Sequence, residues 1–137
     1  MTTIYADTSA WGKLVKQEPE SDHFSAYVDE RLDAGDDFAS SALLITEMNR
    51  LAERFDIPRT LVSEALTQVN IFLPQMSIYR EAGRLPGGDL RSLDAIHLAH
   101  CLAIEADVLA SYDERQLAAA RALGIRTVSP GCSNSDK

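Results

Sequence analysis

The sequence predicts an α/β fold of three layers, α/β/α, in which helices cover both faces of a mainly parallel central sheet. Short apolar runs rich in strand-forming residues alternate with longer segments of helical periodicity along the 137 residues. This alternation is typical of parallel sheets, because each strand then reaches its neighbour through a helix that crosses one face. A chain of this length is usually one domain, so we expect a domain over residues 1–130 and a polar tail over 131–137.

Capping residues and proline delimit the elements of the first half. Asp7, Thr8 and Ser9 directly follow the first apolar run, and each is a residue type that caps helices. Pro19 ends the first helix, because proline disfavours a helical residue before it. Ser40-Ser41 is expected to cap the third helix. The expected elements are strands at 3–6 and 38–39 and helices at 10–15, 21–32 and 43–51.

The second half is delimited in the same way. The Pro86-Gly87-Gly88 turn ends one helix, and Ser92 is expected to cap the next. That helix is apolar almost all round, so we place it in the core. Asp113 is expected to cap the last helix, which Gly124 ends. The expected elements are strands at 71–73, 107–111 and 125–128 and helices at 57–69, 77–85, 93–104 and 114–123.

Four acidic residues stand singly at element boundaries or on helix faces of this predicted fold. Asp7 follows the first strand and Asp113 the strand before the last helix, and ligands of parallel sheets bind outside the carboxyl ends of the strands. Glu47 lies one to two turns into the third helix, and Asp94 lies in the first turn of the core helix. Both helices can start at the same edge of the sheet. The sequence therefore predicts a common meeting point for the four carboxylates.

Such a pocket would suit a hard divalent cation. Mg²⁺ and Mn²⁺ prefer oxygen ligands, and a cluster of carboxylates repels itself unless a cation lies among them. Each acid also has an ordinary structural interpretation. Asp7 and Asp113 stand where helix caps belong, the helix dipole favours Asp94, and Glu47 can be a solvated helix residue. Taken singly, the structural interpretation is the better one for each.

The composition limits the classes of partner. Apolar residues make up 45% of the chain, and no run approaches the roughly 20 apolar residues of a membrane-spanning helix. The first residues lack the features of a secretory signal, so we expect a cytoplasmic protein with no membrane partner. The net charge of −8 argues against a nucleic-acid partner, because phosphate binding draws on basic surfaces. That objection weakens if a metal neutralises some acids and if arginines gather at one cleft; the candidates are Arg50, Arg54, Arg80, Arg84 and Arg91.

Four segments, read in order, resemble the successive motifs of PIN-domain ribonucleases, and most of all the VapC toxins of bacterial type II (VapBC) toxin-antitoxin systems. They are residues 5–10 (YADTSA), 45–50 (ITEMNR), 90–99 (LRSLDAIHLA) and 111–117 (SYDERQL). The third segment is the most specific, and the similarity extends over roughly residues 4–130. Ser111 departs from the family pattern, which usually has threonine there, but it keeps the hydroxyl group.

The resemblance implies a PIN-like fold and a Mg²⁺- or Mn²⁺-dependent endoribonuclease that cleaves RNA of the tRNA or rRNA class and inhibits translation. Carried over by position, Asp7, Glu47, Asp94 and Asp113 match the catalytic acidic quartet, and Asp7, Asp94 and Asp113 match metal ligands. A water molecule activated by the metal would hydrolyse the phosphodiester. The resemblance also implies a homodimer neutralised by a cognate VapB-like antitoxin. Apolar helix faces over 57–73 are consistent with such an interface.

Two other function classes stay open. An α/β phosphatase could use Asp7 as its nucleophile, although haloacid-type phosphatases usually have a second aspartate two positions on, where this chain has Ser9. A non-catalytic PIN-like module would only bind RNA or a protein, and the presence of all four acids counts against it.

Five side chains near the acids have weaker interpretations. Thr8 is left open between a cap and a contact to phosphate or to a metal-bound water, whereas Ser9 is expected to be a cap. Trp11 is expected in the core or an interface, with stacking on a base as the minor alternative. Arg91 is equally a phosphate contact or a solvated side chain. His97 is expected to be packed and hydrogen-bonded rather than catalytic.

Overall fold

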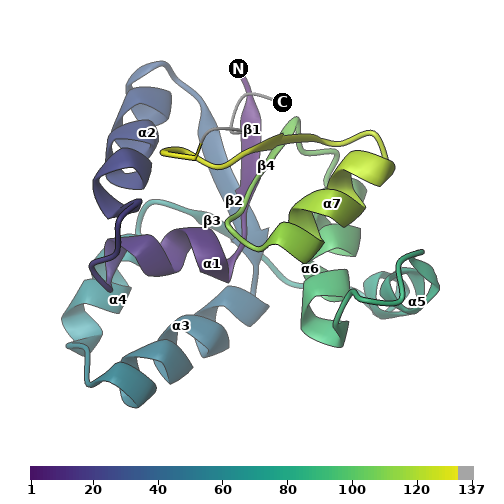
Figure 1. Cartoon of the computed structure of the whole chain (residues 1–137), viewed down its shortest axis with the longest axis horizontal. Coiled ribbons are helices and arrows are strands. Elements are labelled where there is room, and N and C mark those ends of the chain that lie inside the picture. The colour runs from purple at the N-terminus through teal and green to yellow at the C-terminus, as the bar shows by residue number, and fades with distance from the viewer. Residues whose placement is uncertain (133–137) are drawn as a thin grey trace.

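The computed structural model describes residues 1–132 and confirms the three-layer α/β/α architecture (Figure 1). Five parallel strands form one sheet in the order β3-β2-β1-β4-β5. The strands are β1 (Thr3–Ala6), β2 (Asp37–Ser41), β3 (Asn70–Phe72), β4 (Val108–Ala110) and β5 (Arg126–Val128). The helices are α1 (Thr8–Trp11), which continues into the 3₁₀ turn η1 (Gly12–Leu14), then α2 (Ser21–Asp33), α3 (Leu43–Phe55), α4 (Arg59–Leu66), α5 (Met76–Arg84), α6 (Ser92–Ala103) and α7 (Glu114–Ala122).

Alternation along β1 divides the core between the two faces of the sheet. Ile4 and Ala6 belong to a cluster that packs against α1, α2, α3 and α4. Tyr5 points to the other face, where it packs with residues of α6 and α7. Successive side chains of a strand point to opposite faces, so both faces of the central strand are buried. The two helical layers lie on either side of the sheet in Figure 1.

The strand order places a topological switch point between β1 and β4. From β1 the chain proceeds outward through β2 and β3, then returns to pair β4 and β5 on the other side of β1. In open parallel sheets the ligand crevice lies at such a reversal, outside the carboxyl ends of the strands. Asp7 follows the last residue of β1, and its backbone N–H donates to the carbonyl oxygen of Ala110 in β4 at 3.3 Å. The first predicted acid therefore lies at the reversal.

Trp11 anchors the short helix that follows Asp7. Its side chain has no solvent exposure and meets Phe24 and Phe38 edge to face, with ring centroids 5.6 and 5.4 Å away. Edge-to-face pairs add to the stabilisation that aromatic burial provides. The expectation of a core position is confirmed, and the alternative of stacking on a nucleic-acid base is wrong because the ring is enclosed.

The expected serine caps are confirmed only at Ser41. Ser40 and Ser41 belong to β2, where they pair with Ile71 and Phe72 of β3, and the Ser41 hydroxyl also accepts the backbone N–H of Leu43, the first residue of α3, at 3.2 Å. Ser92 is the first residue of α6 and makes no capping hydrogen bond. Serine is common both at helix caps and at strand ends, and pairing with β3 decides between them only after folding. The expected tail lies outside the described residues from residue 133 onward.

Over residues 1–132, no helix combines the length and the apolar character that crossing a bilayer requires.

Candidate active site

Four elements of the fold bring the predicted acids into one electrostatic neighbourhood. Asp7 follows β1, Asp113 follows β4, Glu47 lies in the second turn of α3, and Asp94 lies in the first turn of α6. Burial raises the pKa of Asp94, and the negative charges of Asp113, Asp7 and Glu47 raise it further. Carboxylates alter one another's pKa in this way only over short distances. The four carboxylates therefore lie near enough for three of them to act on Asp94.

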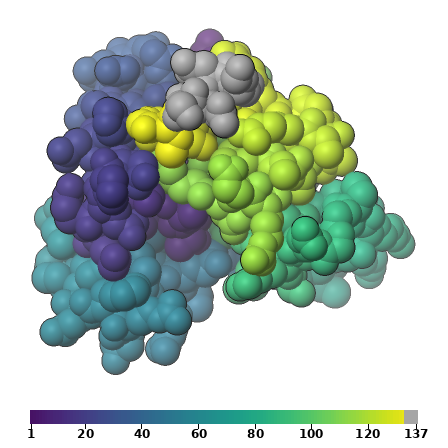
Figure 2. Space-filling model, viewed as in Figure 1, coloured from purple at the N-terminus to yellow at the C-terminus, as the bar shows by residue number. Residues whose placement is uncertain are grey.

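Two cavities of the surface adjoin the site, lined in part by Thr8, Ser9 and Glu47. Figure 2 shows purple atoms from the first residues set back between the blue-green helices and the yellow-green C-terminal segment. In Figure 1 the first turns of α1, α3 and α7 approach the same end of the sheet. Helix N-termini carry partial positive charge, which favours negatively charged groups nearby.

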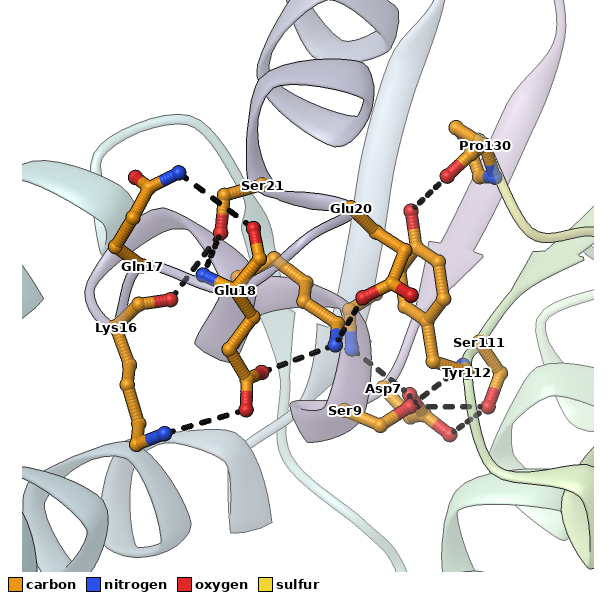
Figure 3. A network of polar contacts seen from close by, with 12 residues as sticks. Asp7, Ser9, Lys16, Gln17, Glu18, Glu20, Ser21, Ser111, Tyr112 and Pro130 are labelled. Atoms are coloured by element: carbon orange, nitrogen blue, oxygen red, sulfur yellow. Dashed lines mark hydrogen bonds and ion pairs between the residues drawn. The ribbon is translucent and has the colours of Figure 1, made fainter. Parts of the chain in front are cut away.

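Asp7 is the most rigidly held of the four acids. Its side chain is 3% exposed, and both of its oxygens accept hydrogen bonds. The Ser9 hydroxyl donates to Oδ1 at 2.6 Å, and the Ser111 hydroxyl donates to Oδ2 at 2.6 Å (Figure 3). The backbone N–H of Ala10 also donates to Oδ1, at 3.3 Å, so Asp7 caps α1. The structural and the functional interpretations of Asp7 are therefore compatible.

The two serines also join the ends of β1 and β4. The Ser9 hydroxyl accepts the backbone N–H of Tyr112 at 2.8 Å, and the Ser111 hydroxyl accepts that of Asp113 at 3.1 Å. Asp7 is thus connected through one hydroxyl group to the backbone of the fourth acid. The expectation that Ser9 is a helix cap was wrong, because its hydroxyl bridges two loops instead.

Burial disfavours the charged form of Asp7. Complete enclosure raises the pKa of this carboxyl above its ordinary value, while the nearby imidazole of His97 and the two serine hydroxyls act to lower it. Removing a carboxylate from water disfavours its charged form. A cation placed beside Asp7 would relieve that cost.

Glu47 is oriented by a chain of buried hydrogen bonds. The hydroxyl of Tyr5 lies 2.6 Å from Nδ1 of His97, and Nε2 of His97 lies 2.6 Å from Oε1 of Glu47. Thr8 donates its hydroxyl to the same oxygen at 2.7 Å. Nε2–H of His97 donates to the Glu47 carboxylate, and the direction of the bond between Tyr5 and Nδ1 depends on the charge of the imidazole. His97 is packed and hydrogen-bonded, as expected, and it also contacts a predicted catalytic residue.

These contacts keep Glu47 ionised. Burial acts to raise the pKa of Glu47, but the hydrogen bonds from His97 and Thr8 outweigh it and hold the pKa below its ordinary value. Burial also raises the pKa of Tyr5, so its hydroxyl keeps its proton. Glu47 is therefore a fixed negative charge at the edge of the acidic neighbourhood.

Asp113 fulfils the capping role that the sequence predicts. Its Oδ1 accepts the backbone N–H groups of Arg115 at 3.0 Å and Gln116 at 3.5 Å. Both bonds use one oxygen, so the second oxygen of this partly exposed carboxylate can bind another group. A cap and a ligand are again compatible in one side chain.

The donor set fits a hard divalent cation in chemistry. All four side chains offer carboxylate oxygens, and the groups that alter the pKa of Asp94 are three carboxylates and one histidine, with no lysine or arginine among them. Within residues 1–132, however, no three His, Cys, Asp or Glu side chains converge as they stand into a metal centre. The assignment of Asp7, Asp94 and Asp113 as metal ligands therefore stays a prediction.

Sequence reasoning missed the groups that hold the acids. Tyr5 reaches the site from β1, and no local pattern distinguishes it from a core residue. Ser111 stands at a family position that keeps a hydroxyl group, but its contact with Asp7 was not predicted. His97 carried a usable signal, because it stands three residues after Asp94 and such residues share a helix face.

Comparison with known proteins gives concordant results. A family model for the PIN domain matches residues 4–122, a span that includes all four acids. Ribonuclease VapC46 of Mycobacterium tuberculosis is 35% identical over 133 residues, which cover 95% of this chain and 99% of the relative. Ribonuclease VapC47 of the same species is 36% identical over 132 residues, covering 93% of this chain and 97% of the relative.

A solved structure supports the fold. The crystal structure of VapC20 of Mycobacterium tuberculosis, described as a sarcin-ricin loop cleaving toxin, matches with a TM-score of 0.66. The match covers 85% of this chain and 94% of the other at 20% sequence identity, so it bears on the fold alone. The family match over most of the chain and the relatives above 30% identity lead to one conclusion: this chain belongs to the PIN-domain family, in its VapC group.

Proposed function

We propose that this protein is an endoribonuclease toxin that hydrolyses RNA phosphodiester bonds with the help of Mg²⁺ or Mn²⁺. The observation that carries the proposal is that Asp7 and Asp113 follow the adjacent strands β1 and β4 at the topological switch point and are joined there through the Ser111 hydroxyl. The VapC relatives at 35 and 36% identity are named ribonucleases, which agrees with this chemistry.

Each acid has a distinct role in the proposed reaction. Asp7, Asp94 and Asp113 would hold the cation, and Glu47 would orient the attacking water through hydrogen bonding. When bound, the cation supplies Lewis-acid stabilisation of the phosphate charge and lowers the pKa of a bound water. Ser9 and Ser111 keep the Asp7 carboxylate in one orientation, which preorganises the site before RNA arrives.

The phosphatase alternative fits less well. Ser9, which stands where a second aspartate would be needed, is committed to the Asp7 carboxylate.

The test is incubation of total bacterial RNA with the purified protein in Mg²⁺ or Mn²⁺, and again with EDTA. We expect discrete fragments with the metal and intact RNA with the chelator, and the fragments would identify the tRNA or rRNA target. Intact RNA in both reactions, with folded and antitoxin-free protein, would contradict the proposal and favour a binding module.

His97 is expected to act as a positioning residue through Glu47. Replacing His97 with leucine should lower kcat by about 10- to 100-fold, the range found when groups behind reactive side chains are removed. KM for RNA should change little, because His97 is buried and cannot contact the substrate. His97→Gln, which can restore a donor near Nε2, should recover part of kcat. Equal losses in both variants would instead indicate a packing role only.

A homodimer is supported by apolar side chains that follow β3. Leu73 is 82% exposed and Met76 is 67% exposed, with Phe72 and Tyr79 also exposed beside them in the chain. Apolar clusters of this kind on small domains mark interaction surfaces. We expect the protein to be dimeric by light scattering and Leu73→Glu/Met76→Glu to be monomeric. Leu32→Glu at the end of α2 is the control, and a monomeric unmodified protein would contradict the assignment.

Neutralisation by a cognate VapB-like antitoxin follows from the same charge distribution. The acidic site and a net charge of −8 suit a basic segment of a partner protein. Expression of this chain should arrest translation and growth, and co-expression of a VapB-like protein from the same genome should restore both. Arrest that persists with every such protein would count against neutralisation.

A further inference from the structure

A cavity of about 490 Å³ lies directly beside Glu47. Four of the residues that line it lie on one face of α3, namely Glu47, Arg50, Leu51 and Arg54. The other lining residues are Thr8, Thr46 and Leu93. The four α3 residues are spaced at i, i+3, i+4 and i+7, so they form one stripe along the helix. The cavity therefore leads from a predicted catalytic carboxylate along α3.

A second cavity extends the first one. It has a volume of about 220 Å³, shares Thr8 and Leu51 with the first, and is lined further on by Phe55 and by Lys16, which is paired with Glu18 of the same wall at 3.2 Å. We call the combined depression, from Glu47 to Phe55, the α3 groove. At 1.5 Å per residue, Arg54 lies roughly 10 Å along the helix axis from Glu47. That length corresponds to about three nucleotides of a stacked strand at 3.4 Å each.

The charge of the α3 groove differs from that of the whole molecule. Within residues 1–132, Arg50 and Arg54 form no ion pair, although the chain carries an excess of acids. Both side chains are exposed. By contrast, Arg59 on α4 is paired with Glu53 at 2.9 Å, and it does not line either cavity. Two uncompensated positive charges therefore face the groove at a spacing of about one helical turn.

The far end of the groove offers an aromatic ring. Phe55 is 46% exposed, and the cationic groups of Lys16 and Arg54 lie 4.8 and 5.8 Å from its ring centroid. Proteins that bind single-stranded nucleic acid combine a basic groove with aromatic side chains on which bases stack. The α3 groove contains both features next to the acidic site.

We propose that the α3 groove binds single-stranded RNA on one side of the bond to be cleaved, with Arg50 and Arg54 contacting successive phosphates and Phe55 supporting a base. This inference rests on the proposed ribonuclease function and adds the path of the substrate. Glu47 at the start of the groove places the first phosphate beside the acidic site. The phosphate-binding arginines compensate locally for the net charge of −8.

An acidic peptide is the competing occupant, and two features favour RNA over it. The carboxylate at the start of the groove repels a phosphate and an acidic side chain alike, so the distinction lies in the spacing of the charges and in the ring. The arginine spacing matches a repeating backbone charge, and the exposed ring at the end matches a base. RNA carries its charge at regular intervals, which a short acidic peptide need not do.

The test measures binding separately from cleavage. Asp94→Asn protein is titrated with a fluorescein-labelled 12-nucleotide single-stranded RNA at several KCl concentrations in the presence of Mg²⁺, with fluorescence anisotropy as the readout. Arg50→Gln/Arg54→Gln should raise Kd by about tenfold or more and reduce the slope of log Kd against log salt by about 1.4, or 0.7 for each phosphate contact. Arg59→Gln makes the same charge change per residue outside the groove and should stay within about twofold.

Two further variants test the details. Phe55→Leu should weaken binding by about fivefold, whereas Phe55→Tyr should retain it, because stacking needs a ring. Arg50→Lys/Arg54→Lys should keep most of the salt dependence, because charge is conserved. In the otherwise unmodified enzyme, Arg50→Gln/Arg54→Gln should raise KM with little change in kcat, as expected for a binding contact away from the reacting atoms.

The outcomes separate this proposal from the one on which it rests. RNA binding that depends on Arg50 and Arg54, without cleavage by the unmodified protein, supports the groove and contradicts the ribonuclease function. Cleavage that is as efficient in the glutamine double variant as in Arg59→Gln overturns the groove and keeps the ribonuclease. Binding of a labelled heptaglutamate peptide through the two arginines, with no arginine-dependent RNA binding, overturns the groove in favour of a protein partner.

Discussion

Asp94→Asn is expected to lower RNA cleavage by about a thousandfold while the protein stays folded. The change removes one charged oxygen from the acidic site. A metal contact that stabilises transition-state charge contributes several kcal/mol, and a loss of about 4 kcal/mol corresponds to a thousandfold lower rate. Folding is retained because Asp94 has no hydrogen-bonded partner within residues 1–132 and is only half-buried. The measurement is the initial rate of fragment formation at saturating Mg²⁺ and saturating RNA.

A matched control exists five residues away. Asp89 is exposed in the turn before α6 and contributes nothing to the raised pKa of Asp94. Asp89→Asn makes the same chemical change without touching the site, so its rate should equal that of the unmodified protein. If Asp94→Asn cleaves RNA as fast as Asp89→Asn does, Asp94 has no role in catalysis and the acidic site is not the active site.

The second large effect concerns stability in the absence of metal. In EDTA at pH 7.5, Asp94→Asn should melt a few degrees above the unmodified protein, the shift that about 1 kcal/mol produces in a domain of this size. Burial and the repulsion by three carboxylates raise the pKa of Asp94, so its charge destabilises the folded state. The expected gain in stability is no larger than this, because solvent screens part of the repulsion at a half-buried side chain. Added Mg²⁺ or Mn²⁺ should reverse the order by stabilising only the unmodified protein.

The pH dependence of stability follows from the raised pKa of Asp94. A carboxyl group whose pKa is raised by folding holds its proton more tightly in the folded state than in the unfolded chain. The free energy of unfolding therefore falls as the pH rises from the ordinary carboxyl range to the folded pKa, and it stays reduced above that. The advantage of Asp94→Asn over the unmodified protein should grow through this window and then level off.

The comparison of the two proteins isolates Asp94 from other groups. Glu47 and Glu18 have lowered pKa values, Glu18 because Lys13 donates a hydrogen bond to it, and they act in the opposite sense as the pH falls. Their contribution is common to both proteins and cancels in the difference. Equal melting temperatures of the two proteins in EDTA at every pH would mean that the acids do not repel one another in solution.

Much of the secondary structure follows from local sequence. The helix over 21–32, the strand at 71–73 and the cap at Asp113 correspond to α2, β3 and the start of α7. Apolar periodicity, proline, glycine and capping side chains act within a few residues of one another, so a single sequence expresses them. The same local rules were misleading at Ser40 and Ser92, because a serine suits a strand end or the first helical turn as well as a cap.

The sequence by itself determined the alternation of strands and helices, the four acids and their positions at element ends. Only the tertiary structure decided the strand order β3-β2-β1-β4-β5, the clamping of Asp7 by Ser9 and Ser111, and the chain from Tyr5 through His97 to Glu47. It also brought the arginines of α3 alongside Glu47 in one groove. The physical reason is that element formation depends on neighbours in the chain. Strand order and side-chain hydrogen bonding instead join residues up to 104 positions apart, and only the packing of the whole domain brings such residues together.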